Sequence, residues 1–223
     1  MEREVFLLPL PGEPRELPER LLWLVGVSRR ERIQRLSDPR DRQAAAYAAL
    51  LVRWCACRTL GATNDALRFA RSSAGKPYLK GEAGFHFSLS HARGVVAAAV
   101  SDREIGVDVE PLAPARPRVA KRCFTDREQA YLCAAADPDR AFYEIWTRKE
   151  AFLKYTGQGL RVPLRSVETI GRTGIRLSTF FAAGCLLSVC DSGEGVPVSL
   201  TVFSEREFWE RAQPLLTQPA DAP

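Results

Sequence analysis

Residues 105–110 read Ile105-Gly-Val-Asp-Val-Glu110, and this stretch carries the pattern around which the chain is organised. Because alternate side chains of a β-strand share a face, its β-branched residues are predicted to point into a core. Asp108 and Glu110 then point together to the other side. Two carboxylates held this close repel each other unless a cation lies between them, and Mg²⁺ takes one or two carboxylates together with water and phosphate oxygens. A solvent-facing strand with ordinary surface acids explains the same pattern.

A second signal is helical, and it reads Trp146-Thr-Arg-Lys-Glu-Ala-Phe-Leu-Lys154. At about 100° per residue, the apolar side chains of residues 142–153 form one stripe. Glu150 lies at the edge of this stripe and Lys154 lies one turn further along the same side, so both side chains can face a cleft. The alternative is a surface pair of Glu and Lys four residues apart, which stabilises a helix by only about 0.2–0.5 kcal/mol.

A third signal combines Gly75-Lys-Pro-Tyr-Leu79 with Phe85-His-Phe-Ser-Leu-Ser-His91. Gly75 and Pro77 place Lys76 in a turn, and the polar face of the following strand ends at Ser90 and His91. A hydroxyl, an imidazole and a lysine of this kind suit the binding of phosphate, whereas an isolated histidine is more often structural. The chain contains no GxSxG, Walker, GxGxxG or HExxH motif, which argues against the commonest hydrolases, NTPases, dehydrogenases and zinc proteases.

The remaining pattern predicts an α+β fold in which helices precede strands twice, giving two halves that meet near residue 103. We expect an N-terminal unit of residues 1–103 and a C-terminal unit of residues 104–223, with a disordered tail from about residue 216. Helices are predicted at 17–36 with a break near Gly26, and at 38–60, 119–123, 125–136, 138–155 and 205–215. Strands are predicted at 4–10, 67–70, 85–89, 95–100, 105–109, 166–170, 175–181, 185–190 and 198–203.

Composition limits the class of protein. The 223 residues are 46% hydrophobic and carry a net charge of +5, as expected of a soluble globular chain, and no apolar run approaches the ~20 residues that cross a bilayer. We expect a cytoplasmic protein whose six cysteines are reduced. Only five of the 32 basic residues are lysines, and arginine suits anionic ligands.

The motifs GKPYL, FHFSLSHARG, IGVDVE and WTRKEAFLKYTGQGL, in this order and spacing, resemble those of 4′-phosphopantetheinyl transferases. The resemblance covers about residues 40–162, and it is to the monomeric type with two similar α/β subdomains in pseudo-two-fold arrangement. It implies transfer of the 4′-phosphopantetheine group of coenzyme A to a serine of an apo acyl or peptidyl carrier protein, which leaves adenosine 3′,5′-bisphosphate. It also implies a role in fatty acid, polyketide or nonribosomal peptide synthesis, without saying which.

The resemblance also implies roles for individual residues. Asp108 and Glu150 are expected to bind Mg²⁺, with Glu110 completing the site directly or through water, and either Glu150 or Glu110 accepts the proton of the attacking serine. Lys154 is expected to stabilise the pyrophosphate. The remaining contacts to coenzyme A are expected from Lys76, Ser90, His91 and an arginine early in the long helix, Arg42 or Arg40.

The basic residues of segment 116–127 are predicted to form a rim around an exposed Phe124 that docks an acidic carrier protein; they are Arg116, Arg118, Lys121, Arg122 and Arg127. The alternative places Phe124 in the core. We expect neither nucleic acid nor membrane among the partners. Two rival functions remain, a coenzyme A-binding protein without chemistry and a Mg²⁺-dependent phosphodiesterase that uses water as its nucleophile.

Overall fold

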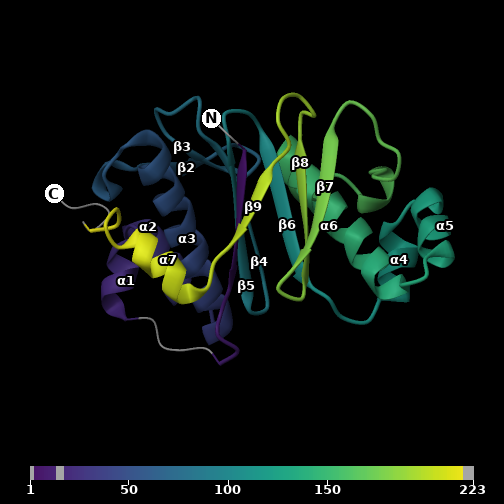
Figure 1. The fold of residues 1–223 in the computed structure, drawn as a ribbon, viewed down its shortest axis with the longest axis horizontal. Helices are drawn as coiled ribbons and strands as arrows, with labels where there is room; N and C mark the ends of the chain where they lie inside the picture. Colours follow the sequence, from purple (N-terminus) through teal and green to yellow (C-terminus); the bar gives the residue numbers. More distant parts are fainter. Residues whose placement is uncertain (1–2, 14–17, 218–223) are drawn as a thin grey trace.

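Strands occupy the middle of the molecule and helices cover it on both sides, as Figure 1 shows for this computed structural model. The structure describes residues 3–13 and 18–217. One sheet has the order β4 (His86–Ala92), β5 (Val95–Ser101), β1 (Glu4–Pro9) and β9 (Ser199–Val202). The other has the order β6 (Ile105–Pro111), β8 (Cys185–Asp191) and β7 (Arg176–Ala182). Neighbouring strands are antiparallel, except that β1 and β9 are parallel.

Side chains that alternate along β1 pack on both faces of the first sheet and so connect the layers of the molecule. Val5 and Leu7 of β1 pack against Val107 and Val189 of the second sheet, so the two sheets share one apolar cluster. Phe6, between them in sequence, points the other way and contacts the helices of the first half. The protein is therefore a stack of helices, sheet, sheet and helices.

The first helical layer is built on α3 (Pro39–Leu60), with α1 (Glu19–Trp23), α2 (Val27–Gln34) and α7 (Glu205–Ala212) around it. Asp38 caps α3 by accepting a hydrogen bond from the Arg40 amide, and Gly61 ends it with a φ of 65°. Its residues from Gln43 to Cys57 are all buried, because strands cover one side of α3 and helices the other.

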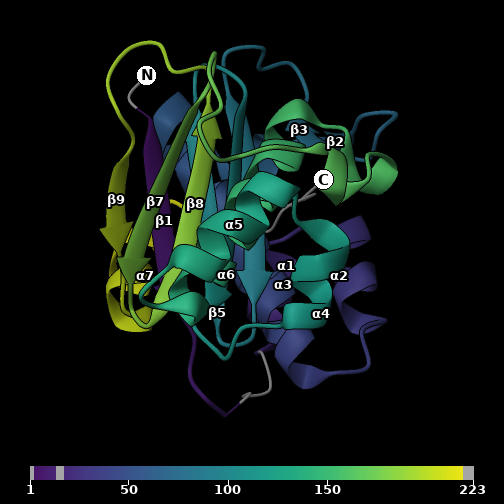
Figure 2. The same ribbon diagram turned by 90° about the vertical axis from the view of Figure 1, so that its right-hand side faces the viewer.

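The second helical layer contains α4 (Pro117–Cys123), α5 (Asp126–Ala134) and α6 (Pro138–Thr156), which Figure 2 shows in front of the strands. Thr125 and Glu128 form a capping box that starts α5. The helix α6 touches the backbone of β6: a Cβ atom added at Gly106 would lie 2.0 Å from the Ala151 carbonyl oxygen and 2.4 Å from the Tyr155 amide nitrogen. Asp108 and Glu110 share this helix-facing side of β6, as the alternation predicted.

The predicted fold class is confirmed, because each half consists of a long helix on antiparallel strands. The boundary at 103/104 remains a prediction, but β9 and α7, assigned above to the second unit, pack on the first half. Strand β9 pairs with β1, and Phe208 of α7 lies 6.3 Å from the Trp54 ring. The buried aromatic residues around Trp54 explain why the chain returns there.

Two local predictions differ from the structure. The strand predicted at 166–170 is wrong, because the amides of Thr169 and Ile170 donate to the carboxylates of Glu128 and Glu168 instead of to a neighbouring strand. The turn around Lys76 is followed by a short strand that was not predicted, β3 (Pro77–Leu79), paired with β2 (Phe69–Arg71). Leu216, in the predicted tail, is buried, while residues 218–223 lie outside the described part.

Among the described helices none has the length and apolarity of a membrane span.

Candidate active site

The site is centred on Asp108, whose side chain is brought together with residues of two other elements. Its Oδ1 atom accepts hydrogen bonds from the Ser90 hydroxyl of β4 and from the Lys154 ammonium of α6, both at 2.7 Å. Asp108 is only 6% exposed. Three of the residues predicted from separate motifs therefore meet at one carboxylate, at the junction of the two halves.

The second oxygen of Asp108 decides what the site can hold. Oδ2 is buried and has no hydrogen-bond partner among the described residues. Leaving such an atom unpaired costs free energy, and a carboxylate oxygen is a preferred ligand of Mg²⁺. Within the described ranges, no three acidic, histidine or cysteine side chains are already spaced as a metal site. The donor set thus fits a hard cation that only one or two carboxylates bind directly.

Glu110 and Glu150 are both affected by the charge of Asp108. Burial raises the pKa of Glu150, and the negative charge of Asp108 raises it further, while Lys154 acts in the opposite direction. Burial and Asp108 also raise the pKa of Glu110, against the opposing charge of Arg116 and a hydrogen bond from the Trp146 side chain. The two glutamates differ in this respect, because the Trp146 bond orients Glu110.

His91 follows Ser90 on β4 and borders a cavity rich in arginine. Burial lowers the pKa of His91, and the charges of Lys154 and Arg29 lower it further, against Asp41 and Asp108. The cavity has a volume of about 530 Å³, and Arg29, Arg32 and Arg71 line it together with His91. Burial lowers the pKa of Arg29, and Arg32 and Arg71 lower it further because positive charges are crowded there, and an anion would relieve this repulsion.

These arginines were not among the residues predicted from the sequence. Arg29 and Arg32 are three residues apart on α2, the spacing that places two side chains on one face of a helix. That spacing is a detectable signal. Arg71 joins them only through the pairing of β2 with β3, which the sequence did not reveal.

The structure does not bring Arg42 into this site. Its guanidinium donates to the carbonyl oxygens of Leu36 at 2.7 Å and Ser37 at 3.1 Å, and so holds the connection between α2 and α3. Arg40 instead lines a second cavity beside His91, with a volume of about 430 Å³. The long helix was the predicted source of an arginine, whereas α2 supplies the clustered ones.

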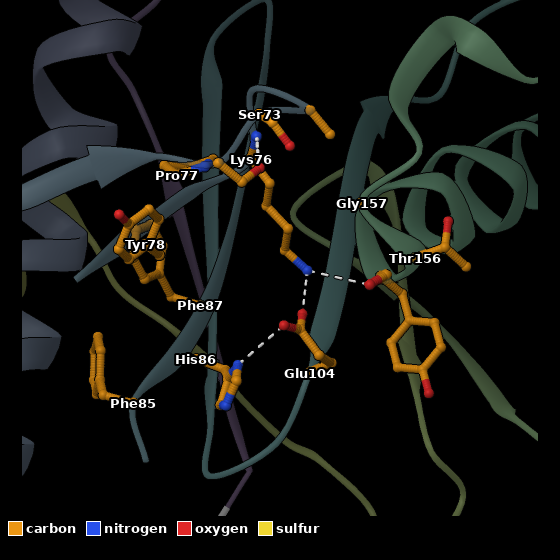
Figure 3. A pocket seen from close by; sticks show the side chains of 13 residues that line it. Ser73, Lys76, Pro77, Tyr78, Phe85, His86, Phe87, Glu104, Thr156 and Gly157 are labelled. Carbon is orange, nitrogen blue, oxygen red and sulfur yellow. Dashed lines mark hydrogen bonds and ion pairs between the residues drawn. The ribbon is translucent and has the colours of Figure 1, made fainter. Parts of the chain in front are cut away.

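Lys76 contacts atoms of the second half of the chain. Its ammonium reaches the carboxylate of Glu104 beside a cavity of about 630 Å³ (Figure 3). It also donates to the carbonyl oxygens of Tyr155 and Ile105. The expected contact of Lys76 with coenzyme A stays a prediction.

Phe124 is not the exposed aromatic expected at the carrier surface. It is completely buried, and its ring lies 5.2 Å from that of Phe142. The chain buries it because the aromatic residues of α6 form the core of this half. The predicted basic residues around it are all exposed on α4, at its ends and on α5; they are Arg116, Arg118, Lys121, Arg122 and Arg127.

Sequence comparisons identify the class to which this fold and site belong. The model described as "4'-phosphopantetheinyl transferase superfamily" matches residues 104–198, and "4'-phosphopantetheinyl transferase, N-terminal" matches residues 18–103. A 4′-phosphopantetheinyl transferase of Bacillus subtilis is 32% identical over 151 residues, which are 66% of this chain and 67% of that protein.

Two further relatives support the same class. The 4′-phosphopantetheinyl transferase Sfp of Bacillus subtilis strain 168 is 27% identical over 206 residues, 85% of this chain and 92% of its own. The human L-aminoadipate-semialdehyde dehydrogenase-phosphopantetheinyl transferase is 30% identical over 173 residues, 68% of this chain and 56% of its own. The chain belongs to the 4′-phosphopantetheinyl transferase superfamily, and the predicted resemblance is confirmed.

Proposed function

We propose that this chain transfers the 4′-phosphopantetheine group of coenzyme A to a serine of an apo carrier protein, and that the reaction takes place at Asp108. The observation that carries the location is the buried Asp108 carboxylate, which has one oxygen bound by Ser90 and Lys154 and the other unpaired. A site with this much negative charge repels phosphates unless a cation intervenes.

Asp108 and Glu150, with Glu110 directly or through water, are the residues that would hold Mg²⁺. When bound, the ion neutralises charge that develops on the pyrophosphate as its P–O bond breaks. Lys154 lies within 2.7 Å of Asp108, so its ammonium is placed to bind a pyrophosphate oxygen beside that carboxylate. Ser90 and His91, which are neighbours on β4 of the first half, would supply further hydrogen bonds.

Glu150 is the better candidate for the base that accepts the proton of the carrier serine. A raised pKa brings a carboxylate closer to the pH at which proton transfer is efficient. Glu110 shares this property, but Arg116 and Trp146 both favour its charged form and act against the rise of its pKa. The serine oxygen then attacks the phosphorus next to the pantetheine arm, and adenosine 3′,5′-bisphosphate leaves with the electron pair of the broken P–O bond.

The arginine cavity beside His91 holds the phosphorylated adenosine end of coenzyme A. Arg29, Arg32 and Arg71 gather positive charge in a volume large enough for part of a nucleotide, and guanidinium groups bind phosphate with two parallel hydrogen bonds. A phosphate bound next to His91 would act against the burial and the positive charges that lower its pKa, and so would favour the protonated imidazole.

The exposed basic residues of segment 116–127 receive the carrier protein through the acidic side chains of the carrier. Arg116 also acts on the site, because its charge lowers the pKa of Glu110. Docking here relies on charge and not on Phe124, so the complex forms quickly and weakens with salt. Since both halves of one chain complete the site, a monomer suffices for the reaction.

The test is intact-mass spectrometry of an apo acyl carrier protein and an apo peptidyl carrier domain, each incubated with the protein, coenzyme A and either Mg²⁺ or EDTA. We expect a mass gain of one phosphopantetheine arm with Mg²⁺ and none with EDTA. Cleavage of coenzyme A in the absence of a carrier indicates a phosphodiesterase instead. Binding of coenzyme A without transfer or cleavage indicates a protein that has lost its chemistry.

A further inference from the structure

The side chain of Lys76 connects the two halves of the molecule. It leaves the turn between β2 and β3 in the first half, and its ammonium reaches the Glu104 carboxylate and the Tyr155 carbonyl oxygen at 3.2 Å (Figure 3). The ammonium also lies 3.4 Å from the Ile105 carbonyl oxygen. An ammonium group has three donors, and these three acceptors use them all.

The acceptors of Lys76 lie next to the catalytic residues in sequence. Tyr155 directly follows Lys154 in the last turn of α6, where carbonyl oxygens lack partners within the helix and the helix dipole favours a cation. Ile105 begins β6, three residues before Asp108. A group fixed to both acceptors therefore restrains the ends of α6 and β6 relative to each other.

Hydrogen bonds also hold the backbone of Lys76 in its turn. The Lys76 amide donates to the Ser72 hydroxyl at 3.1 Å, and the Ser72 amide donates back to the Lys76 carbonyl oxygen at 2.8 Å. Arg71 and Pro77, which flank this turn, line the arginine cavity. The turn thus belongs to the wall of the proposed coenzyme site.

The ion pair by itself is a weak restraint. Glu104 is half exposed and shares its carboxylate with His86, whose Nδ1 lies 3.3 Å away, and exposed pairs contribute little to stability. The backbone acceptors and the packing of the lysine stem add to it: the Lys76 Cδ atom lies 3.6 Å from the position that a Cβ of Gly157 would take. Only about a fifth of the Lys76 side chain is exposed.

We infer that Lys76 is a positioning residue, which clamps the coenzyme-binding turn of the first half to the ends of α6 and β6 that carry Lys154 and Asp108. The inference rests on the proposed function and revises the role expected for Lys76 from sequence. The clamp sets the distance between bound coenzyme and catalytic groups, and small misplacements of reacting groups lower kcat steeply.

The test compares Lys76→Met, Glu104→Gln and the double variant, with Lys80→Met as a control for loss of an exposed lysine just beyond β3. We expect Lys76→Met to lower kcat on the order of tenfold at saturating coenzyme A, and Glu104→Gln, which leaves the two backbone acceptors in place, to lower it less. The double variant lowers kcat no further than Lys76→Met alone, because both changes act on one clamp. The melting temperatures show the same lack of additivity, and Lys80→Met leaves kcat and melting temperature as in the wild type.

Two results overturn the inference. If Lys76 binds a coenzyme phosphate directly, Lys76→Met raises KM for coenzyme A at constant kcat, and Glu104→Gln leaves KM unchanged or lowers it by freeing the lysine. If the contact is only structural, both variants melt earlier but keep kcat and KM at temperatures where they are folded. A wild type that transfers nothing refutes the proposed function instead, while the thermal coupling of Lys76 with Glu104 still reports whether the contact forms.

Discussion

The long helices α3 and α6 begin and end alike but differ in what they expose. Each follows an aspartate cap and a proline, Asp38-Pro39 and Asp137-Pro138, and each ends at a left-handed glycine. Helix α3 is surrounded by strands on one side and helices on the other, so nearly its whole surface is apolar. Helix α6 leaves one flank at the junction of the halves, where Glu150 and Lys154 lie.

Because of this difference, α3 mainly supports the fold, whereas α6 also supplies residues to the proposed active site. The enclosed middle of α3 mainly packs, and in the first half Arg29 and Arg32 of α2 and His91 of β4 line the arginine cavity. The half with the open helix flank supplies the acids. The proposed active site therefore needs both halves: the arginines and His91 come from the first, and the carboxylates and Lys154 come from the second.

The largest expected effect is the loss of transfer in Asp108→Asn, which keeps the shape of the side chain and removes the negative charge that would hold Mg²⁺. We expect transfer to fall by about a thousandfold or more, since several kcal/mol of transition-state stabilisation are lost. Asp102→Asn, on the exposed turn before β6, is the matched control. Carrier modification followed by mass spectrometry measures both variants, and near-normal turnover of Asp108→Asn contradicts the site.

Gly106→Ala tests the contact that holds α6 against β6. An added Cβ lies 2.0 Å from a backbone oxygen of α6, so the helix must move, and we expect a loss of about 3 kcal/mol in the free energy of unfolding. Gly84→Ala is the control, because no atom lies within 4 Å of its added Cβ. Urea unfolding compares the two, and equal stabilities mean that α6 does not rest on this strand.

The acidic site residues of the second half were more predictable from the sequence than the basic residues of the first half. Strand alternation places Asp108 and Glu110 on one face, and helical periodicity places Glu150 and Lys154 on one flank. Both patterns are local, so they could be read without the fold. The basic half depends on packing between distant segments: Arg71 meets Arg29 only once β2, β3 and α2 are assembled. Phe124 shows the same limit, since periodicity does not tell a buried aromatic from an exposed one in a short helix.

Arg29→Gln and Arg32→Gln test the basic half. Each removes a charged donor for phosphate, and we expect the KM for coenzyme A to rise about tenfold, in line with 1.5–3 kcal/mol for a hydrogen bond to a charged group. Arg35→Gln is the control: it lies on the same helix segment, but its side chain is 77% exposed. Calorimetry at two salt concentrations measures the affinity. Equal losses in all three variants would mean a general effect of charge and no coenzyme cavity.

The smallest expected effect is thermal and concerns Glu150→Gln. Because the pKa of Glu150 is raised in the folded protein, this group's contribution to stability is fully present below its unfolded pKa, near 4.5, and is lost as the pH rises through the folded pKa. At pH 7.5 the ionised glutamate therefore destabilises the fold, and glutamine removes that cost. Without divalent cations we expect the melting temperature to rise by a few degrees, although the variant is inactive.

Glu168→Gln is expected to change the melting temperature in the opposite direction. Burial acts to raise the pKa of Glu168, but hydrogen bonds from Thr125 and from the amides of Ile170 and Thr169 outweigh it and lower that pKa. Its contribution is present above the unfolded pKa and is lost as the pH falls, so glutamine lowers the melting temperature at pH 7.5. Near pH 4 both differences shrink. We expect added Mg²⁺ to raise the melting temperature of the wild type more than that of Glu150→Gln, because the glutamine lacks the carboxylate that binds the ion. An equal rise in both proteins would mean that Glu150 is not a metal ligand.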